Sequence, residues 1–124
     1  MTEFLEVAKV SELEDGKMKM VIIEGKEFLI AKVKGKYYAT QNRCPHMGGN
    51  LSQGKLEGTI VTCPRHGSQF DLTDGHVIRW TDWAGLIAVV AKVAKSPRPL
   101  HTYEMKMEGE NLMLATDGKA SSKY

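Results

Sequence analysis

The chain has 124 residues, which suffices for one domain with a sizeable core but not for two independent domains. Its 17 Lys and Arg residues against 15 Asp and Glu residues give a net charge of +2, and both signs are spread along the chain. A nucleic-acid binder would show a clustered basic stripe, so this class of protein is excluded.

The N-terminal sequence, residues 1–7, is acidic and lacks the basic region and apolar stretch of a secretory signal, which predicts a cytoplasmic protein. The longest largely apolar stretch, residues 83–94, contains Lys92. It is too short to cross a bilayer, which takes about 20 residues. We therefore expect no membrane span.

The first third of the chain is typical of short strands separated by turns, and it predicts an antiparallel meander. Turn residues lie at 14–16, 24–26 and 34–36. The predicted strands are Phe4–Val7, Met18–Ile23, Phe28–Val33 and Tyr37–Thr40.

From Gln41 to Gly75 prolines and glycines interrupt every run, and both cysteines lie in this segment. The pattern predicts two loops joined by one short strand at Thr59–Thr62. Further strands are predicted at His76–Trp80, Tyr103–Met107 and Leu112–Ala115, the last two joined by a hairpin turn at 108–111. The fold class is therefore all-β.

A segment between these strands has a different period. Apolar residues recur at helical spacing over residues 83–95 and stop at Ser96-Pro97, which predicts one short amphipathic helix. Its apolar face would cover the core of the sheets or dock a partner. Residues 117–124 are small and polar, and we expect a flexible tail there.

Both cysteines belong to one pattern with two of the four histidines: Cys44-Pro-His46, sixteen residues, and Cys63-Pro-Arg-His66. Four such side chains on two loops can converge on a metal centre. A structural zinc ion uses two Cys and two His, typically from C-x2-C and H-x3-H pairs. Here each loop supplies one Cys and one His, a distribution that suits a two-iron cluster with sulfur ligands on one iron and nitrogen ligands on the other.

With these motifs the chain resembles the Rieske family, from the turn at Asp15-Gly16 through Asp71 to the hairpin at Gly109. The resemblance implies one 2Fe-2S cluster whose inner iron is bound by Cys44 and Cys63. His46 and His66 would bind the outer iron through Nδ1. It also implies a single domain over residues 1–116, with stacked antiparallel sheets, a cluster-binding subdomain at about 42–72 and the helix at about 83–95 as an insertion.

The resemblance also concerns the surroundings of the cluster. Backbone N–H groups at 47–49 and 67–69 would donate to its sulfurs, and the Ser68 hydroxyl would donate to a bridging sulfide. High-potential respiratory members have a tyrosine where this chain has Phe70. Their loops are joined by a disulfide whose cysteines would fall at Gly49 and Arg65. Fewer donors and no disulfide favour the low or middle part of the Rieske range, which is roughly −150 to +300 mV.

The function implied is that of a soluble one-electron carrier, not an enzyme, that passes electrons from a reductase to a terminal oxygenase or a similar acceptor. No room is left for a second domain with mononuclear iron, and no G-x-G-x-x-G nucleotide motif is present. The chain is also similar to the small subunit of NADH-dependent nitrite reductase. A zinc-stabilised structural or interaction domain is the alternative from another class.

Overall fold

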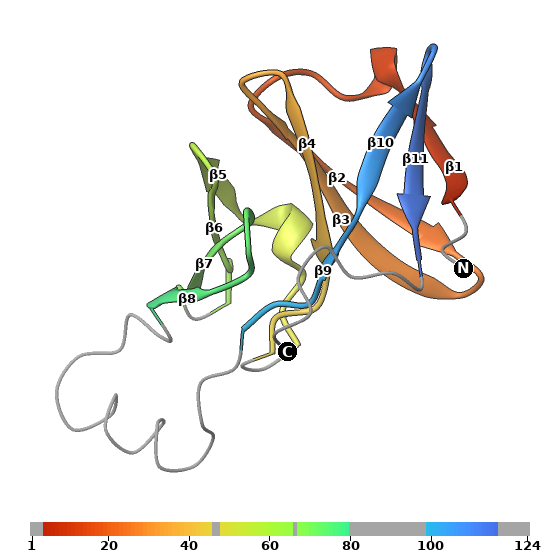
Figure 1. Cartoon of the computed structure of the whole chain (residues 1–124). Coiled ribbons are helices and arrows are strands. Elements are labelled where there is room, and N and C mark those ends of the chain that lie inside the picture. The colour runs from red at the N-terminus through yellow and green to blue at the C-terminus, as the bar shows by residue number, and fades with distance from the viewer. Residues whose placement is uncertain (1–3, 46–47, 66, 80–98, 117–124) are drawn as a thin grey trace, which may run out of the picture.

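The computed structural model describes residues 4–45, 48–65, 67–79 and 99–116, and these residues form eleven strands in three antiparallel sheets. Figure 1 shows the sheets as layers, with the four-stranded sheet of β2, β3, β4 and β9 in the middle. The predicted fold class, all-β with stacked antiparallel sheets, is confirmed. The predicted helix at 83–95 and the tail at 117–124 lie outside the described residues. Within the described residues, no helix has the length and apolar character needed to cross a membrane.

The outer sheet joins the two ends of the chain. β1 (Phe4–Lys9) pairs with β11 (Asn111–Ala115), which also pairs with β10 (Met105–Glu108). The prediction that the first strand begins a meander with the second is therefore wrong. After β1 the short helical turn η1 (Val10–Glu12) carries the chain into a different sheet.

The middle sheet contains the predicted meander, formed by β2 (Lys17–Ile23), β3 (Lys26–Val33) and β4 (Lys36–Gln41). Its two hairpins have two-residue turns in which both residues have positive φ, at 54° and 79° for Glu24-Gly25 and at 50° and 80° for Lys34-Gly35. Such turns match the right-handed twist of the flanking strands. β9 (Thr102–Tyr103) adds to the edge of β4.

The third sheet consists of β5 (Lys55–Glu57), β6 (Ile60–Thr62), β7 (Gln69–Asp71) and β8 (Val77–Arg79). The sequence predicted β6 and β8 but missed β5 and β7, which have three residues each. It also predicted one strand at Tyr103–Met107, which is wrong. β9 and β10 are separated at Glu104 because they pair in different sheets.

Strand β3 lies between two hydrophobic cores, because successive side chains of a strand point to opposite faces. Phe28 and Ile30 face the core shared with the outer sheet, and Leu29 and Ala31 face the core shared with the third sheet. All four side chains are buried. We call the second of these the cluster core, because it contains both cysteines; its buried members are Leu29, Ala31, Cys44, Leu51, Val61, Cys63, Phe70, Leu72 and Leu100.

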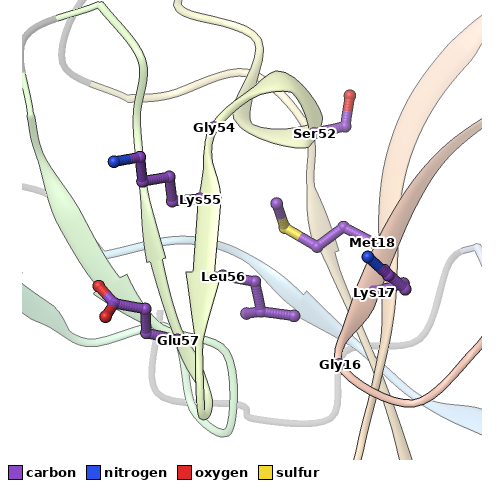
Figure 2. Close-up of a pocket in the computed structure, with 8 residues that line it drawn as sticks. All are labelled: Gly16, Lys17, Met18, Ser52, Gly54, Lys55, Leu56 and Glu57. Carbon is purple, nitrogen blue, oxygen red and sulfur yellow. The ribbon is translucent and has the colours of Figure 1, made fainter.

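A cavity of about 490 Å³ lies where the third sheet meets the start of β2, beside the short helical turn η2 (Leu51–Gln53). Figure 2 shows Met18 and Leu56 pointing toward one another across it, while Lys55 and Glu57 point to the other side of β5. Met18 and Leu56 also pack against the cluster core. The cavity is therefore an open part of the contact between the two sheets.

Candidate metal centre

Two buried cysteines follow strands of two different sheets, the middle sheet and the third sheet. Cys44 follows β4 and Cys63 follows β6, each side chain is 3% exposed, and both belong to the cluster core. Core packing therefore brings together the thiol groups that the sequence placed on separate loops. His46 and His66 lie outside the described residues, so their role as ligands stays a prediction.

The two cysteine loops are closed in the same way. In the first, the Cys44 N–H donates to the Gly49 carbonyl at 2.8 Å and the Gly48 N–H donates to the Cys44 carbonyl at 2.8 Å. In the second, the Cys63 N–H donates to the Ser68 carbonyl at 2.7 Å and the Gly67 N–H donates to the Cys63 carbonyl at 3.2 Å. We call residues 44–49 and 63–68 the first and second cluster loops.

Each cluster loop has a glycine with positive φ four residues after its cysteine, 75° at Gly48 and 77° at Gly67. Only glycine adopts this conformation without a steric cost. The N–H groups of both glycines donate to cysteine carbonyls and so close the loops, while the donation of backbone N–H groups at 47–49 and 67–69 to the cluster sulfurs stays a prediction.

Gly49 is the point at which the two loops come closest. A Cβ atom at this position would lie 2.6 Å from Sγ of Cys63 and 3.2 Å from Cβ of Arg65. The first distance is too short for a real contact, so the absence of a side chain at Gly49 leaves the space beside the Cys63 sulfur open. The second shows that the positions of the respiratory disulfide, occupied here by a glycine and an arginine, do face each other.

A network of polar side chains connects the residues on both sides of the first cluster loop. Asn42 is fully buried, and its amide nitrogen donates to Oε1 of Glu27 at 2.8 Å and to Oδ1 of Asn50 at 3.0 Å. Its amide oxygen accepts from the Ser52 N–H at 3.1 Å. The loop is thereby tied to β3 on one side and to η2 on the other.

Glu27 also forms an ion pair with Arg43, with 3.0 Å between Oε2 and the guanidinium nitrogen. The hydrogen bonds from Arg43 and then from Asn42 hold the pKa of the Glu27 carboxyl below its usual value. The other guanidinium nitrogen of Arg43 donates to the Gly48 carbonyl at 3.3 Å. Strand β3 is in this way connected to the backbone of the first cluster loop.

A second arginine contacts the second cluster loop. Arg79, at the end of β8, donates from Nε and from a terminal nitrogen to the Gly67 carbonyl, at 3.1 and 3.0 Å. No sequence motif marks Glu27, Asn42, Arg43 or Arg79. Asn42 and Arg43 directly precede Cys44, which is a signal of proximity. Glu27 lies close to them, and Arg79 close to the second cluster loop, only through the pairing of the strands.

Phe70 and Ser68 are fully buried, and Phe70 lies with the cysteines in the cluster core. His76 and His101, the histidines outside the motif, are exposed, as expected of surface residues.

The described residues fit a cluster with cysteine ligands. Two buried thiol groups lie on loops that are closed by the same pair of backbone hydrogen bonds. The missing side chain at Gly49 leaves room beside the Cys63 sulfur. Among the described residues no three His, Cys, Asp or Glu side chains are grouped so as to hold a metal ion. The motif predicts His46 and His66 as the two remaining ligands, and both lie outside the described residues.

The chain belongs to the Rieske family: a model of the Rieske [2Fe-2S] domain matches residues 3–104. Its cofactor is accordingly a Rieske-type 2Fe-2S cluster, which favours the cluster over the structural zinc ion.

Individual relatives agree with this assignment. The ferredoxin component of the naphthalene 1,2-dioxygenase system of Pseudomonas aeruginosa is 33% identical over 92% of this chain and 97% of its own length. The ferredoxin component of biphenyl 2,3-dioxygenase of Rhodococcus jostii is 31% identical over 77% of each chain. A chain in a solved complex of reduced oxygenase and oxidised ferredoxin of carbazole 1,9a-dioxygenase has the same fold, with a TM-score of 0.76 at 24% identity over 98% of this chain and 100% of that chain.

Proposed function

We propose that this chain is the ferredoxin component of an oxygenase system, a one-electron carrier between a reductase and an oxygenase. The observation that carries the proposal is the match to dioxygenase ferredoxin components over nearly the full length of both chains. Those relatives are named as separate components, so a chain of this size acts as a carrier and not as the enzyme that oxidises the substrate.

In this proposal Cys44 and Cys63 bind one iron and His46 and His66 bind the other. When bound, the cluster supplies one reversible one-electron couple. The protein holds both thiolates in the cluster core and closes both loops with the same pair of backbone hydrogen bonds. The buried side chains of Leu51 and Phe70 exclude water from the sulfurs on the core side.

The potential is expected in the low or middle part of the Rieske range. Two imidazole ligands leave the oxidised centre without net charge, which makes an electron easier to add than in a four-cysteine cluster. Within the Rieske family, however, the potential is expected to be lower than in the respiratory members, because Phe70 has no hydroxyl group that could donate to the cluster. A carrier of such potential fits between a flavin reductase and an oxygenase.

We further propose that the protein works in the cytoplasm, where a reductase that uses a nicotinamide cofactor would supply its electrons. The small subunit of NADH-dependent nitrite reductase remains the second candidate from the sequence. The dioxygenase ferredoxin components that match are the reason for placing the oxygenase system first.

The experiment is an anaerobic electron-transfer assay. Dithionite-reduced protein, freed of excess reductant, is mixed with the oxidised oxygenase component of the Pseudomonas naphthalene system and, separately, with a nitrite reductase large subunit. We expect the visible spectrum to report loss of one electron per chain to the oxygenase, and none from a Cys63→Ser variant. Electron transfer to the nitrite reductase alone would contradict the proposal.

A further inference from the structure

We propose that Arg43 and Arg79 are a matched pair of positioning residues, each of which holds one cluster loop in its electron-carrying conformation. The inference rests on the proposed function and adds to it two residues outside the predicted ligand set. Each guanidinium binds the carbonyl of the positive-φ glycine of one loop, Arg43 that of Gly48 and Arg79 that of Gly67.

The two arginine contacts occur at equivalent positions of the two cluster loops. Gly48 and Gly67 each follow a ligand cysteine by four residues, and each donates its N–H to that cysteine's carbonyl. Two arginines from different parts of the chain, Arg79 in β8 and Arg43 in the segment after β4, donate to the corresponding carbonyl. Since the two loops differ in sequence and in the spacing of their histidines, the shared contact reflects a shared requirement of the backbone.

The requirement follows from the planar trans peptide, in which the carbonyl and the following N–H point in opposite directions. An arginine that holds the Gly48 carbonyl therefore directs the Gly49 N–H to the opposite side of the loop. Gly49 is the residue whose Cβ atom would lie 2.6 Å from the Cys63 sulfur. In the second loop Arg79 fixes the N–H of Ser68, a fully buried residue, in the same manner.

Both arginines therefore act on the cluster in two ways. They orient backbone N–H groups that stabilise the additional electron, and they bring positive charge to the loops. The Arg43 charge is paired with Glu27, whereas Arg79 has no ion pair among the residues that the structure describes. This difference allows orientation and charge to be separated by mutation.

The test uses the cluster-loaded protein and three variants. Arg79→Gln removes contact and charge, Arg79→Lys keeps the charge but loses the two-bond contact, and the double variant Glu27→Gln with Arg43→Gln removes the contact without changing the net charge. Lys55→Gln is the control, since Lys55 is an exposed cation of the third sheet with no side-chain hydrogen bond among the described residues. The readouts are the midpoint potential, the EPR line shape and the rate of cluster loss to an iron chelator.

We expect Arg79→Gln and the double variant to lower the midpoint potential, to change the EPR line shape and to lose the cluster roughly tenfold faster, the effect of one hydrogen bond to a charged group. Arg79→Lys should fall between Arg79→Gln and the wild type, and Lys55→Gln should match the wild type. Unchanged potential and line shape in cluster-loaded Arg79→Gln and the double variant would overturn the proposal, as would an equal fall in Lys55→Gln. A wild-type protein that binds no reducible cluster would instead refute the proposed function.

Discussion

Gly48 and Gly49 are adjacent in the first cluster loop, yet each position requires glycine for a different reason. Gly48 has a φ of 75° and open space around it, so the constraint is conformational. Gly49 is next to the Cys63 sulfur, so the constraint is steric. The two positions therefore separate backbone strain from crowding at the metal centre.

Gly49→Ala should lower the iron content per chain, because its Cβ atom would lie 2.6 Å from the Cys63 sulfur, which we expect to bind iron. Gly48→Ala, its matched control, should retain the cluster and lose only about 1–2 kcal/mol of stability from the left-handed backbone. Iron and sulfide analysis together with thermal unfolding measures both effects. Full iron content in Gly49→Ala would show that the loops are not held as close as the structure places them.

Phe70→Tyr tests the reason given for the expected low midpoint potential. The new hydroxyl would lie in the cluster core beside Cys63, where a donor to sulfur stabilises the added electron. A redox titration should show a higher midpoint potential than in the wild type, while Phe70→Leu, which adds no donor, should show no rise. An unchanged potential in a fully loaded Phe70→Tyr protein would remove this explanation.

At the residue scale the sequence could indicate that Cys44 and Cys63 belong to one site, because Cys and His at short spacing are rare by chance. Both cysteines do lie in the cluster core, and their role as ligands stays a prediction. It could not identify Arg79 or Glu27. Their contacts with the loops depend on the pairing of β7 with β8 and on the position of β3, which no local pattern encodes.

The elements around the first cluster loop are joined by side chains and not by strand pairing alone. Among the described residues, one isolated bridge, Arg43 with Asn50, connects the two sides of this loop in the manner of a sheet. The hydrogen bonds of Asn42 and Glu27 add the remaining connections to β3 and η2. Glu27 makes these contacts as an ionised carboxylate, so the stability that they contribute depends on pH.

The pKa of Glu27 is lower in the folded protein than in the unfolded chain, so its carboxylate contributes stability above the unfolded value, near 4.5, and loses it as the pH falls through the folded value. Glu27→Gln should therefore be less stable than the wild type at neutral pH. The difference should narrow as the pH falls below about 4.5.

Thermal unfolding midpoints between neutral and acidic pH measure this difference. Glu14→Gln is the control, because its exposed carboxylate has no side-chain hydrogen bond among the described residues. A gap between wild type and Glu27→Gln that stays constant across this range would contradict the role given to the ion pair with Arg43.

The hairpins of the middle sheet could be predicted because each turn has a local signal, a glycine at its second position. β5 and β7 could not, since three residues carry too little alternation to be recognised. The pairing of β1 with β11 joins residues about a hundred positions apart, and no turn residue marks such a contact.

In the whole molecule, β3 separates the core that holds the cysteines from the core that closes the outer sheet. Neighbouring residues of one strand consequently serve different parts of the protein. Leu29 faces the cluster core and Ile30 the other core, and both side chains are buried.

Leu29→Ala and Ile30→Ala should each reduce stability by about 2–5 kcal/mol, because each leaves a cavity in a packed core. Only Leu29→Ala should also change the EPR line shape and speed cluster loss. Denaturant unfolding and EPR on the two variants distinguish these effects, and an equal spectral change in Ile30→Ala would show that the two cores do not act separately.

The central claim is a Rieske cluster with two cysteine and two histidine ligands. Nitrogen hyperfine spectroscopy of the dithionite-reduced protein, labelled with ¹⁵N only in its histidines, tests it most directly. We predict an EPR signal with two strongly coupled histidine nitrogens, both lost together with the cluster when His46 and His66 are replaced. A reduced cluster without coupled nitrogen, or a colourless protein that contains zinc, would contradict the claim.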